Sequence, residues 1–267
     1  MTNASAFPWP GSCQGAVSLT FDDGDKTQLE MALPTLQQHH LQGTFYISPS
    51  GDDWRQRLAP WREVALAGHE LGNHTVQHIC SRNLSGEGSR GLEGLALHEI
   101  EADVLAAERR LRELVPEQTT RTFCYPCYQS YVGEGPSQQS YVPVIAKHFP
   151  AARGLGEVPN HPARADLHYL SSWPVGGWMS SAQLVRLAEV AAERGRWVIL
   201  TFHALQRGPR TDWVPGSCYH EPPLPVASFG ELCASLDAQR ERIWVAPVIA
   251  IAQRIRAWRE TTKGEQR

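Results

Sequence analysis

The chain has 267 residues, of which 42% are hydrophobic and 20% are charged, and its formal net charge is 25 − 28 = −3. That length and apolar content suit one α/β domain of the barrel class, or two small domains. The near-neutral charge excludes the basic footprint of a protein that binds nucleic acid or an anionic membrane surface. We find no apolar run long enough to span a bilayer and no signal-peptide pattern, so we expect a soluble cytoplasmic protein with no membrane partner.

Strand and helix patterns alternate along the chain. The predicted strands cover residues 16–21, 43–47, 121–125, 197–202 and 243–245. The predicted helices cover residues 26–39, 54–67, 95–114, 142–149, 181–194, 229–239 and 246–258. Pro34 should kink or shorten the first of these helices. Repeated strand–helix units imply a parallel sheet with helices outside it.

Two long segments between these elements are rich in Ser, Gly or Pro. They cover residues 81–94, after a histidine pair, and residues 206–225, after another histidine. Loops of this length are more often functional or disordered than inert. We expect them to form walls or lids of a substrate cleft, and disordered insertions are the alternative.

Two short segments carry the residues best suited to chemistry. Asp22 and Asp23 follow the predicted strand 16–21, and His74 and His78 form the single His-x-x-x-His pair of the chain. Each segment alone is a weak signal, because Asp-Asp-Gly makes good turns and a histidine pair can lie on a helix surface. Together, one aspartate and two histidines are a suitable ligand set for a divalent metal, and the other aspartate can act as a base.

These motifs resemble those of the polysaccharide deacetylases of the NodB homology type, carbohydrate esterase family 4. The matching segments are Thr-Phe-Asp-Asp-Gly at 20–24, Gly-His-Glu-Leu-Gly-Asn-His at 68–74, and the apolar run that ends at His203. The resemblance extends from about residue 15 to about residue 255 and implies a single catalytic domain over residues 1–267. It implies an α/β fold, the distorted (β/α) barrel of the NodB homology type. The implied function is metal-dependent removal of acetyl groups from N- or O-acetylated carbohydrate.

The resemblance also assigns roles to individual residues. Asp23, His74 and His78 would hold a divalent metal, with zinc as our first choice and cobalt, nickel or manganese as substitutes. Asp22 would be the general base, and His203 the general acid that protonates the departing group.

A third family motif departs from its usual pattern. The family run Phe-Arg-x-Pro-Tyr-Gly is replaced at residues 123–128 by Phe-Cys-Tyr-Pro-Cys-Tyr. Cys124 stands where the family has an arginine that tunes the acidity of the catalytic base. Asp22 therefore lacks the residue that tunes the base in the family. Cys127 stands at the tyrosine position and can still offer its backbone N–H to the oxyanion. We therefore expect a divergent branch that keeps its activity.

Six cysteines are scattered along the chain at positions 13, 80, 124, 127, 218 and 233. A chain of this length needs no disulfide framework, and we expect ordinary thiols in a reducing compartment. Cys80 is expected near Cys127 and could be a fourth metal ligand. We prefer a role outside the ligand set, because another thiolate would close the open position that catalysis needs.

Several alternatives stay open at this level. Asp166 is a weak candidate to orient His203, and His220 with Glu221 could enter the site from the second long loop. The protein could instead open a small cyclic amide or ureide, or bind carbohydrate without catalysis. The intact set of charged residues argues against the silent protein, because a buried charged cluster is costly to keep. The oligomeric state and the natural substrate are left open.

Overall fold

A computed structural model of the protein describes residues 7–85, 88–208 and 221–264. The main sheet is made of parallel strands: β1 (Gly15–Asp22), β2 (Thr44–Ile47), β3 (Glu70–Asn73), β4 (Phe123–Cys124), β7 (Ala152–Arg153), β8 (Trp173–Pro174), β9 (Trp197–Phe202) and β12 (Ile243–Val245). Their order is β7-β4-β3-β2-β1-β9-β8, and β12 pairs with the first residues of β1. The alternating strand and helix patterns thus predicted the parallel sheet correctly.

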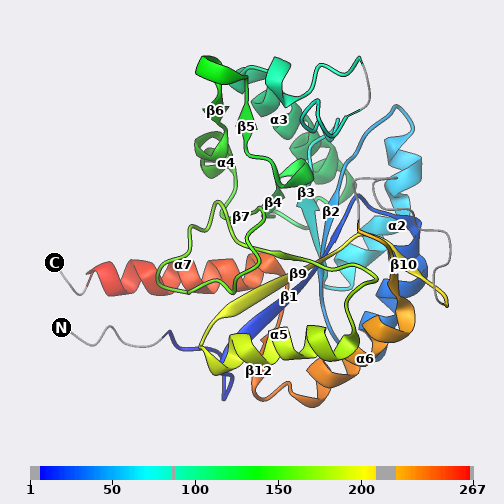
Figure 1. The fold of residues 1–267 in the computed structure, drawn as a ribbon, viewed down its shortest axis with the longest axis vertical. Coiled ribbons are helices and arrows are strands. Elements are labelled where there is room, and N and C mark those ends of the chain that lie inside the picture. The colour runs from blue at the N-terminus through cyan, green and yellow to red at the C-terminus, as the bar shows by residue number, and fades with distance from the viewer. Residues whose placement is uncertain (1–6, 86–87, 209–220, 265–267) are drawn as a thin grey trace.

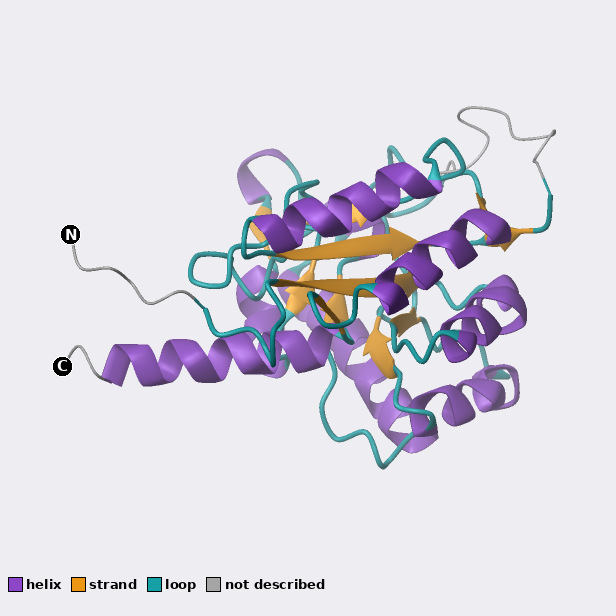
Figure 2. Cartoon of the chain, turned by 90° about the horizontal axis from the view of Figure 1, so that it is seen from below, coloured by secondary structure: helices purple, strands orange, loops and turns teal. Residues whose placement is uncertain are grey.

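Helices cover the sheet from several sides. They are α1 (Leu33–Gln38), α2 (Trp54–Leu66), α3 (Leu97–Leu114), α4 (Val142–His148), α5 (Ser181–Glu193), α6 (Val226–Ala238) and α7 (Val248–Gly264). In Figure 1, β1 and β9 lie side by side, with α5 and α6 below them and α3 and α4 above. The turned view in Figure 2 shows helices on both sides of the central strands. None of the helices in the described part of the chain has the length and apolar character needed to cross a bilayer.

The predicted elements are confirmed, with shifts of a few residues at their ends. The predicted helix 26–39 is divided into a π-helical turn, Gln28–Ala32, and α1. Pro34 comes directly after this π-helical turn, across which Leu33 N donates to Gln28 O, so the helical hydrogen-bond pattern changes next to the proline. The sequence patterns did not assign β3, and they missed short strands of two residues each: β5 (Tyr131–Val132), β6 (Gln139–Ser140), β7, β8, β10 (Leu205–Gln206) and β11 (Leu224–Pro225).

Three phenylalanines fix the register at the centre of the sheet. Phe21 is paired with Phe45 on β2 and with Phe202 on β9. The ring centroids of Phe21 and Phe45 are 4.7 Å apart, and those of Phe21 and Phe202 are 5.3 Å apart. Because strand side chains alternate between faces, burying Phe21 sends the next residue, Asp22, to the other face. The hydrophobic core therefore decides where the first carboxylate of the site points.

The buried carboxylate of Glu70 holds β3 in place. It accepts hydrogen bonds from Thr44 Oγ1 on β2 at 2.9 Å and from Ile249 N in α7 at 3.0 Å. Its other oxygen accepts from the backbone N and the Oγ1 of Thr122, each at 2.7 Å, just before β4. These bonds join three strands and a helix, so β3 presents the histidine that follows it from a well-anchored strand.

Candidate active site

The candidate site lies at the carboxyl ends of the parallel strands. Asp22 ends β1, His74 follows β3, and His203 follows β9. Neighbouring parallel strands end at the same edge of a sheet, so side chains far apart in sequence meet there. They line a cavity of about 130 Å³, called the reaction cavity below. Its lining residues are Asp22, His74, His78, Leu84, Tyr125, Cys127, Tyr128 and His203.

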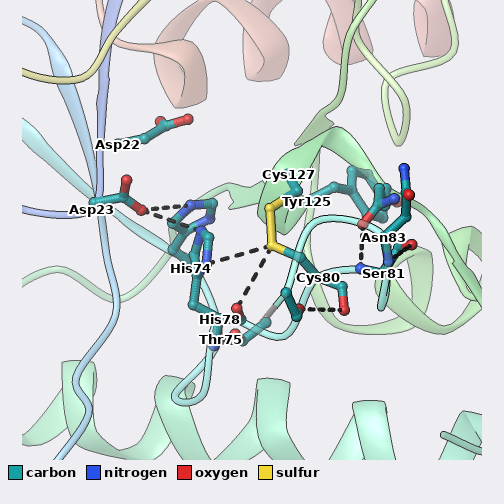
Figure 3. Close-up of a disulfide and its surroundings, with 12 residues drawn as sticks. Asp22, Asp23, His74, Thr75, His78, Cys80, Ser81, Asn83, Tyr125 and Cys127 are labelled. Carbon is teal, nitrogen blue, oxygen red and sulfur yellow. Dashed lines mark hydrogen bonds and ion pairs between the residues drawn. A yellow bond between two sulfur atoms is a disulfide. The ribbon is translucent and has the colours of Figure 1, made fainter. Parts of the chain in front are cut away.

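A left-handed turn brings the second carboxylate to the same place. The φ angles of Asp23 and Gly24 are 70° and 65°, and aspartate tolerates this region better than most residues. Asp23 Oδ1 then lies 3.4 Å from His74 Nε2 and 3.2 Å from His78 Nε2. The structure thus brings together the three residues that the sequence named as metal ligands, and Figure 3 shows Asp23 facing both imidazoles.

The histidine pair lies on a loop and not on a helix face. Thr75 N donates to Asn73 Oδ1 at 3.0 Å, and His78 N donates to Thr75 Oγ1 at 2.9 Å. Thr75 and His78 both have positive φ angles, of 60° and 48°. The convergence of the two imidazoles therefore depends on side-chain bonds within the loop and not on the four-residue spacing of a helix.

The Asp23–His74–His78 group fits a divalent metal in its donors and in its hydrogen bonding. One ligand atom from each residue lies within 4.8 Å of the others. His74 Nδ1 lies 2.9 Å from the Cys124 carbonyl oxygen, so this nitrogen donates and Nε2 keeps its lone pair for a ligand. Burial alone would raise the pKa of Asp23, but the bonds to both imidazoles hold that pKa far below its usual range.

Two other groups at the site fit a metal less well. In the Asp22–His74–Cys124 group, burial raises the pKa of the Cys124 thiol well above its usual value, so the sulfur keeps its proton. In the His78–Cys80–Cys127 group, both sulfurs belong to a disulfide and offer no thiolate. The metal role of Asp23, His74 and His78 stays a prediction, and it is the assignment that the donor chemistry favours.

The buried carboxylate of Asp22 is paired with Arg153 on β7. Arg153 Nη2 bonds both oxygens of Asp22, and the guanidinium has no exposed surface. The same nitrogen lies 2.9 Å from Cys124 Sγ, and the guanidinium carbon lies 4.9 Å from the centre of the Tyr46 ring. Burial would raise the pKa of Asp22, but Arg153 and, less strongly, His74 lower it, so the carboxylate stays ionised.

Arg153 was missed by the sequence reasoning, which found no source of positive charge for Asp22 once Cys124 occupied the arginine position. β7 is too short to show a strand period, so nothing in the local sequence marked Arg153 as a site residue. The one available signal was physical: a buried carboxylate needs a cation from some other part of the chain.

Glu221 orients His203 across the reaction cavity. His203 Nδ1 lies 2.8 Å from Glu221 Oε2, so its Nε2 faces the carboxylates, 3.9 Å from Asp22 Oδ2. Burial would lower the pKa of His203, but the bond to Glu221 and the charge of Asp22 outweigh it and raise that pKa. Asp166, the earlier candidate for this role, is exposed and lies 3.7 Å from His168. The other candidate, His220, lies outside the described residues.

A glutamine holds the ends of β1 and β9 together beneath these side chains. Gln28 Nε2 donates to the carbonyl oxygens of Asp22 at 2.6 Å and of His203 at 2.8 Å. The Gln28 side chain is fully buried, so these two hydrogen bonds are protected from water. Gln28 thereby fixes the spacing of the backbone that carries Asp22 and His203.

Cys80 and Cys127 form a disulfide, which corrects the expectation that all cysteines are thiols. Their Cα atoms are 5.8 Å apart, and the bond joins the loop after the histidine pair to the wall of the reaction cavity (Figure 3). Cys13, Cys124 and Cys233 are free. The cytoplasmic location stays a prediction, and the disulfide weighs against it, because disulfides persist mainly in oxidising compartments.

Comparisons with known proteins agree with this arrangement. A family model described as polysaccharide deacetylase matches residues 11–132. A peptidoglycan-N-acetylglucosamine deacetylase of Bacillus cereus is 30% identical over 104 residues, which are 38% of this chain and 42% of that protein. A chitooligosaccharide deacetylase of Sinorhizobium fredii is 32% identical over 115 residues, which are 43% of this chain and 47% of that protein. The match therefore spans less than half of the length of either relative.

A solved structure from Mycobacterium smegmatis, assigned to the polysaccharide deacetylases, has the same fold. Its TM-score is 0.59 at 18% identity, and the superposition covers 97% of this chain and 96% of that one. This likeness confirms the distorted (β/α) barrel. The matched family segment includes Asp22, Asp23 and the histidine pair, but Arg153 and Glu221 lie beyond it.

Replacing Arg153 should move the acid limb of the pH–activity profile. Asp22 can act as a base only when ionised, so activity is lost as the pH falls through its pKa. Arg153→Met removes the cation that lowers this pKa, and the acid limb of kcat/KM should move to higher pH. Arg153→Lys keeps a positive charge and should move the limb less.

Arg121→Met is the matched control, because Arg121 is also buried but lies away from the site, near Glu108. Both Met variants should lose stability, by about 3–5 kcal/mol where a buried ion pair is broken, measured by chemical unfolding. An acid limb that moves equally in the two variants would mean that the shift reflects loosened folding and not the Arg153–Asp22 pair.

Glu221→Gln should move the alkaline limb in the opposite direction. His203 must be protonated to act as an acid, so activity is lost as the pH rises through its raised pKa. Without the Glu221 charge this pKa falls, and the loss should occur at lower pH in the profile of kcat/KM. Glu101→Gln, which disrupts a surface pair with His148, is the control. An unchanged alkaline limb would show that Glu221 does not support the acid.

Proposed function

We propose that the chain is a polysaccharide deacetylase of the NodB homology type, a metal-dependent hydrolase that removes acetyl groups from N- or O-acetylated carbohydrate; the family match, the two deacetylase relatives and the shared fold support this. One observation carries the proposal. The carboxylate of Asp22, kept ionised by Arg153, and the protonatable imidazole of His203 face each other in one small cavity. General base and general acid on opposite sides of a bond are what acyl transfer to water requires.

Asp22 is the proposed base, because Arg153 keeps it ionised and its side chain lines the reaction cavity. It takes the proton from the attacking water. His203 is the proposed acid, because Glu221 fixes the ring so that Nε2 faces the cavity and carries a proton. It protonates the sugar nitrogen or oxygen as the acetyl group leaves, which an amine leaving group needs most.

Asp23, His74 and His78 would hold the metal, with zinc as the first choice. When bound, a divalent ion would supply positive charge that polarises the acetyl carbonyl and acidifies the attacking water. The backbone N–H of Cys127 is the proposed additional donor to the oxyanion, since Cys127 lines the reaction cavity. Its φ of 50° is unusual for a residue other than glycine, and the disulfide to Cys80 ties it down.

Replacing Asp22 and Asp23 one at a time by asparagine should distinguish the general base from the metal ligand. Asp22→Asn should keep nearly all of its metal, measured by elemental analysis, while turnover of an N-acetyl sugar falls roughly 10²–10⁴-fold, the usual contribution of general acid–base catalysis. Asp23→Asn should lower metal affinity as well, because it removes a charged ligand. If Asp22→Asn loses its metal and Asp23→Asn retains it, the two roles are exchanged.

Replacement of His203 should affect substrates according to their leaving groups. His203→Ala should slow an N-acetyl sugar far more than an aryl acetate, because a good leaving group departs without a proton. The ratio of the two losses in kcat/KM is the measurement. Equal losses would mean that His203 positions the substrate or supports the fold. Including small cyclic amides and ureides in the wild-type assay tests the competing amidohydrolase activity.

A further inference from the structure

One imidazole and two sulfurs form a second group of donor atoms beside the proposed metal ligands. The group consists of His78, Cys80 and Cys127 and is called the sulfur site below. One ligand atom from each residue lies within 4.8 Å of the others. The two sulfurs are joined in the disulfide, and Figure 3 shows the His78 ring beside it.

The ring of His78 lies between two sets of donors. Its Nε2 is 3.2 Å from Asp23 Oδ1, and its Nδ1 is 3.8 Å from Cys80 Sγ. The first nitrogen therefore faces the proposed catalytic metal, and the second faces the disulfide (Figure 3). His78 is the one residue that the two sets share.

The two sulfurs have no part in the proposed reaction. Catalysis uses only the backbone N–H of Cys127, and the family motif that the chain resembles has tyrosine at that position. Cys80 contributes no atom to the proposed base, acid or ligand set. The pair therefore needs another explanation than acetyl transfer.

Reduction of the disulfide by a dithiol would turn both sulfurs into metal donors. Cys80 is 8% exposed, whereas Cys127 is half-buried and lines the reaction cavity, so Cys127 Sγ is the more accessible target. A thiolate of the reductant attacks this sulfur, and Cys80 leaves with the electron pair of the S–S bond. The second thiol of the reductant then displaces Cys127. The reductant departs as a cyclic disulfide, and its two protons and two electrons stay on the cysteines.

Hydrogen bonds hold the two cysteines close without the covalent bond. Ser81 N, next to Cys80, donates to Gln129 Oε1 at 2.7 Å, and Leu92 N donates to the Cys80 carbonyl at 3.1 Å. The Cα atoms of Cys80 and Cys127 are 5.8 Å apart. Two thiolates, each about 2.3 Å from a zinc ion, lie no more than about 4.6 Å apart, which this Cα separation allows.

The donors of the reduced sulfur site suit a thiophilic metal. Two thiolates and one imidazole favour Zn²⁺ or Cd²⁺ over metals that prefer oxygen ligands. The catalytic set contains a carboxylate in place of sulfur, so it is the weaker competitor for a soft ion. The side chain of His78 is 25% exposed, which leaves solvent on this side to complete the coordination.

His78 can serve only one of the two sets at a time. A neutral imidazole has one N–H and one lone pair. When Nε2 binds a metal together with Asp23 and His74, Nδ1 carries the proton. When Nδ1 binds a metal together with Cys80 and Cys127, the proton must lie on Nε2, and the catalytic set is left without one of its ligands.

We propose that the sulfur site binds a thiophilic divalent metal when its disulfide is reduced, and that this binding withdraws His78 from Asp23 and His74. The disulfide then protects the catalytic ligands from such metals. Binding at the sulfur site is independent of the proposed deacetylase function, and only its effect on turnover rests on that function.

The test compares the oxidised and the reduced full-length protein. The disulfide is reduced with a phosphine, which carries no thiol, and excess reductant is removed. Cd²⁺ is then titrated while the ultraviolet charge-transfer absorption of the Cd²⁺–thiolate bond is recorded, and bound cadmium is measured by elemental analysis. The reduced protein should show a band that saturates with one ion, and the oxidised protein should show none.

Matched variants assign the band to its ligands. Cys80→Ser should abolish it, whereas Cys13→Ser, which removes a free cysteine outside the sulfur site, should keep it. In the reduced protein, His78→Ala should weaken Cd²⁺ binding at least about tenfold, since even the loss of a residue behind a ligand costs that much. His74→Ala should not weaken it, because this change removes the competitor for His78. Circular dichroism confirms that each variant is folded.

Turnover of an N-acetyl sugar measures the withdrawal of His78. One equivalent of Cd²⁺ should inhibit the reduced protein and leave the oxidised protein active. The reduced Cys80→Ser variant should resist the same addition. Equal inhibition of the oxidised and reduced proteins would mean that Cd²⁺ acts directly on the catalytic ligands, and would overturn the protective role of the disulfide.

The absorption experiment decides the site separately from the reaction. No thiolate band in the reduced protein, or a band that Cys80→Ser leaves unchanged, overturns the sulfur site. Equal Cd²⁺ affinity in the His78→Ala and wild-type proteins overturns the sharing of His78. A band that depends on Cys80 and His78, in a protein without turnover in either state, supports the site, and the deacetylase proposal alone fails.

Discussion

The buried carboxylate of Asp22 is the constraint on which the site depends. It is only 2% exposed, so its charge must be compensated within the protein. The compensation comes from Arg153 at the end of β7, which requires β7 to lie beside β4 and the sheet to continue that far. Such a pair adds little net stability, because desolvation offsets the attraction. Its consequence is chemical: it keeps the buried Asp22 carboxylate ionised.

Two adjacent carboxylates lie in different surroundings. Asp22 lies against one guanidinium, whereas Asp23 is partly exposed and lies between two imidazoles. The proposed division into base and metal ligand requires divergent environments of this kind. Relocation of the guanidinium from the motif position, now Cys124, to Arg153 preserves this division. The two positions are adjacent in space because β4 and β7 pair at Cys124 and Arg153.

The disulfide joins two parts of the site that are distant in sequence. Cys80 follows the histidine pair, and Cys127 lines the reaction cavity. Leu84, four residues after Cys80, lines the same cavity. The covalent bond therefore holds the loop that carries His78 against the cavity wall.

The sequence alone determined what is local: the strand and helix periods, the carboxylates after β1, the histidine pair, and His203 after β9. The carboxylates and His203 are readable because each follows an apolar run of several residues, and the histidine pair is readable from its spacing. Tertiary structure alone decided the Arg153–Asp22 pair, the contact of Glu221 with His203, and the Cys80–Cys127 bond. These partners lie on short or irregular segments without a period. Only the packing of the parallel strands, whose ends gather at one edge, brings them within bonding distance.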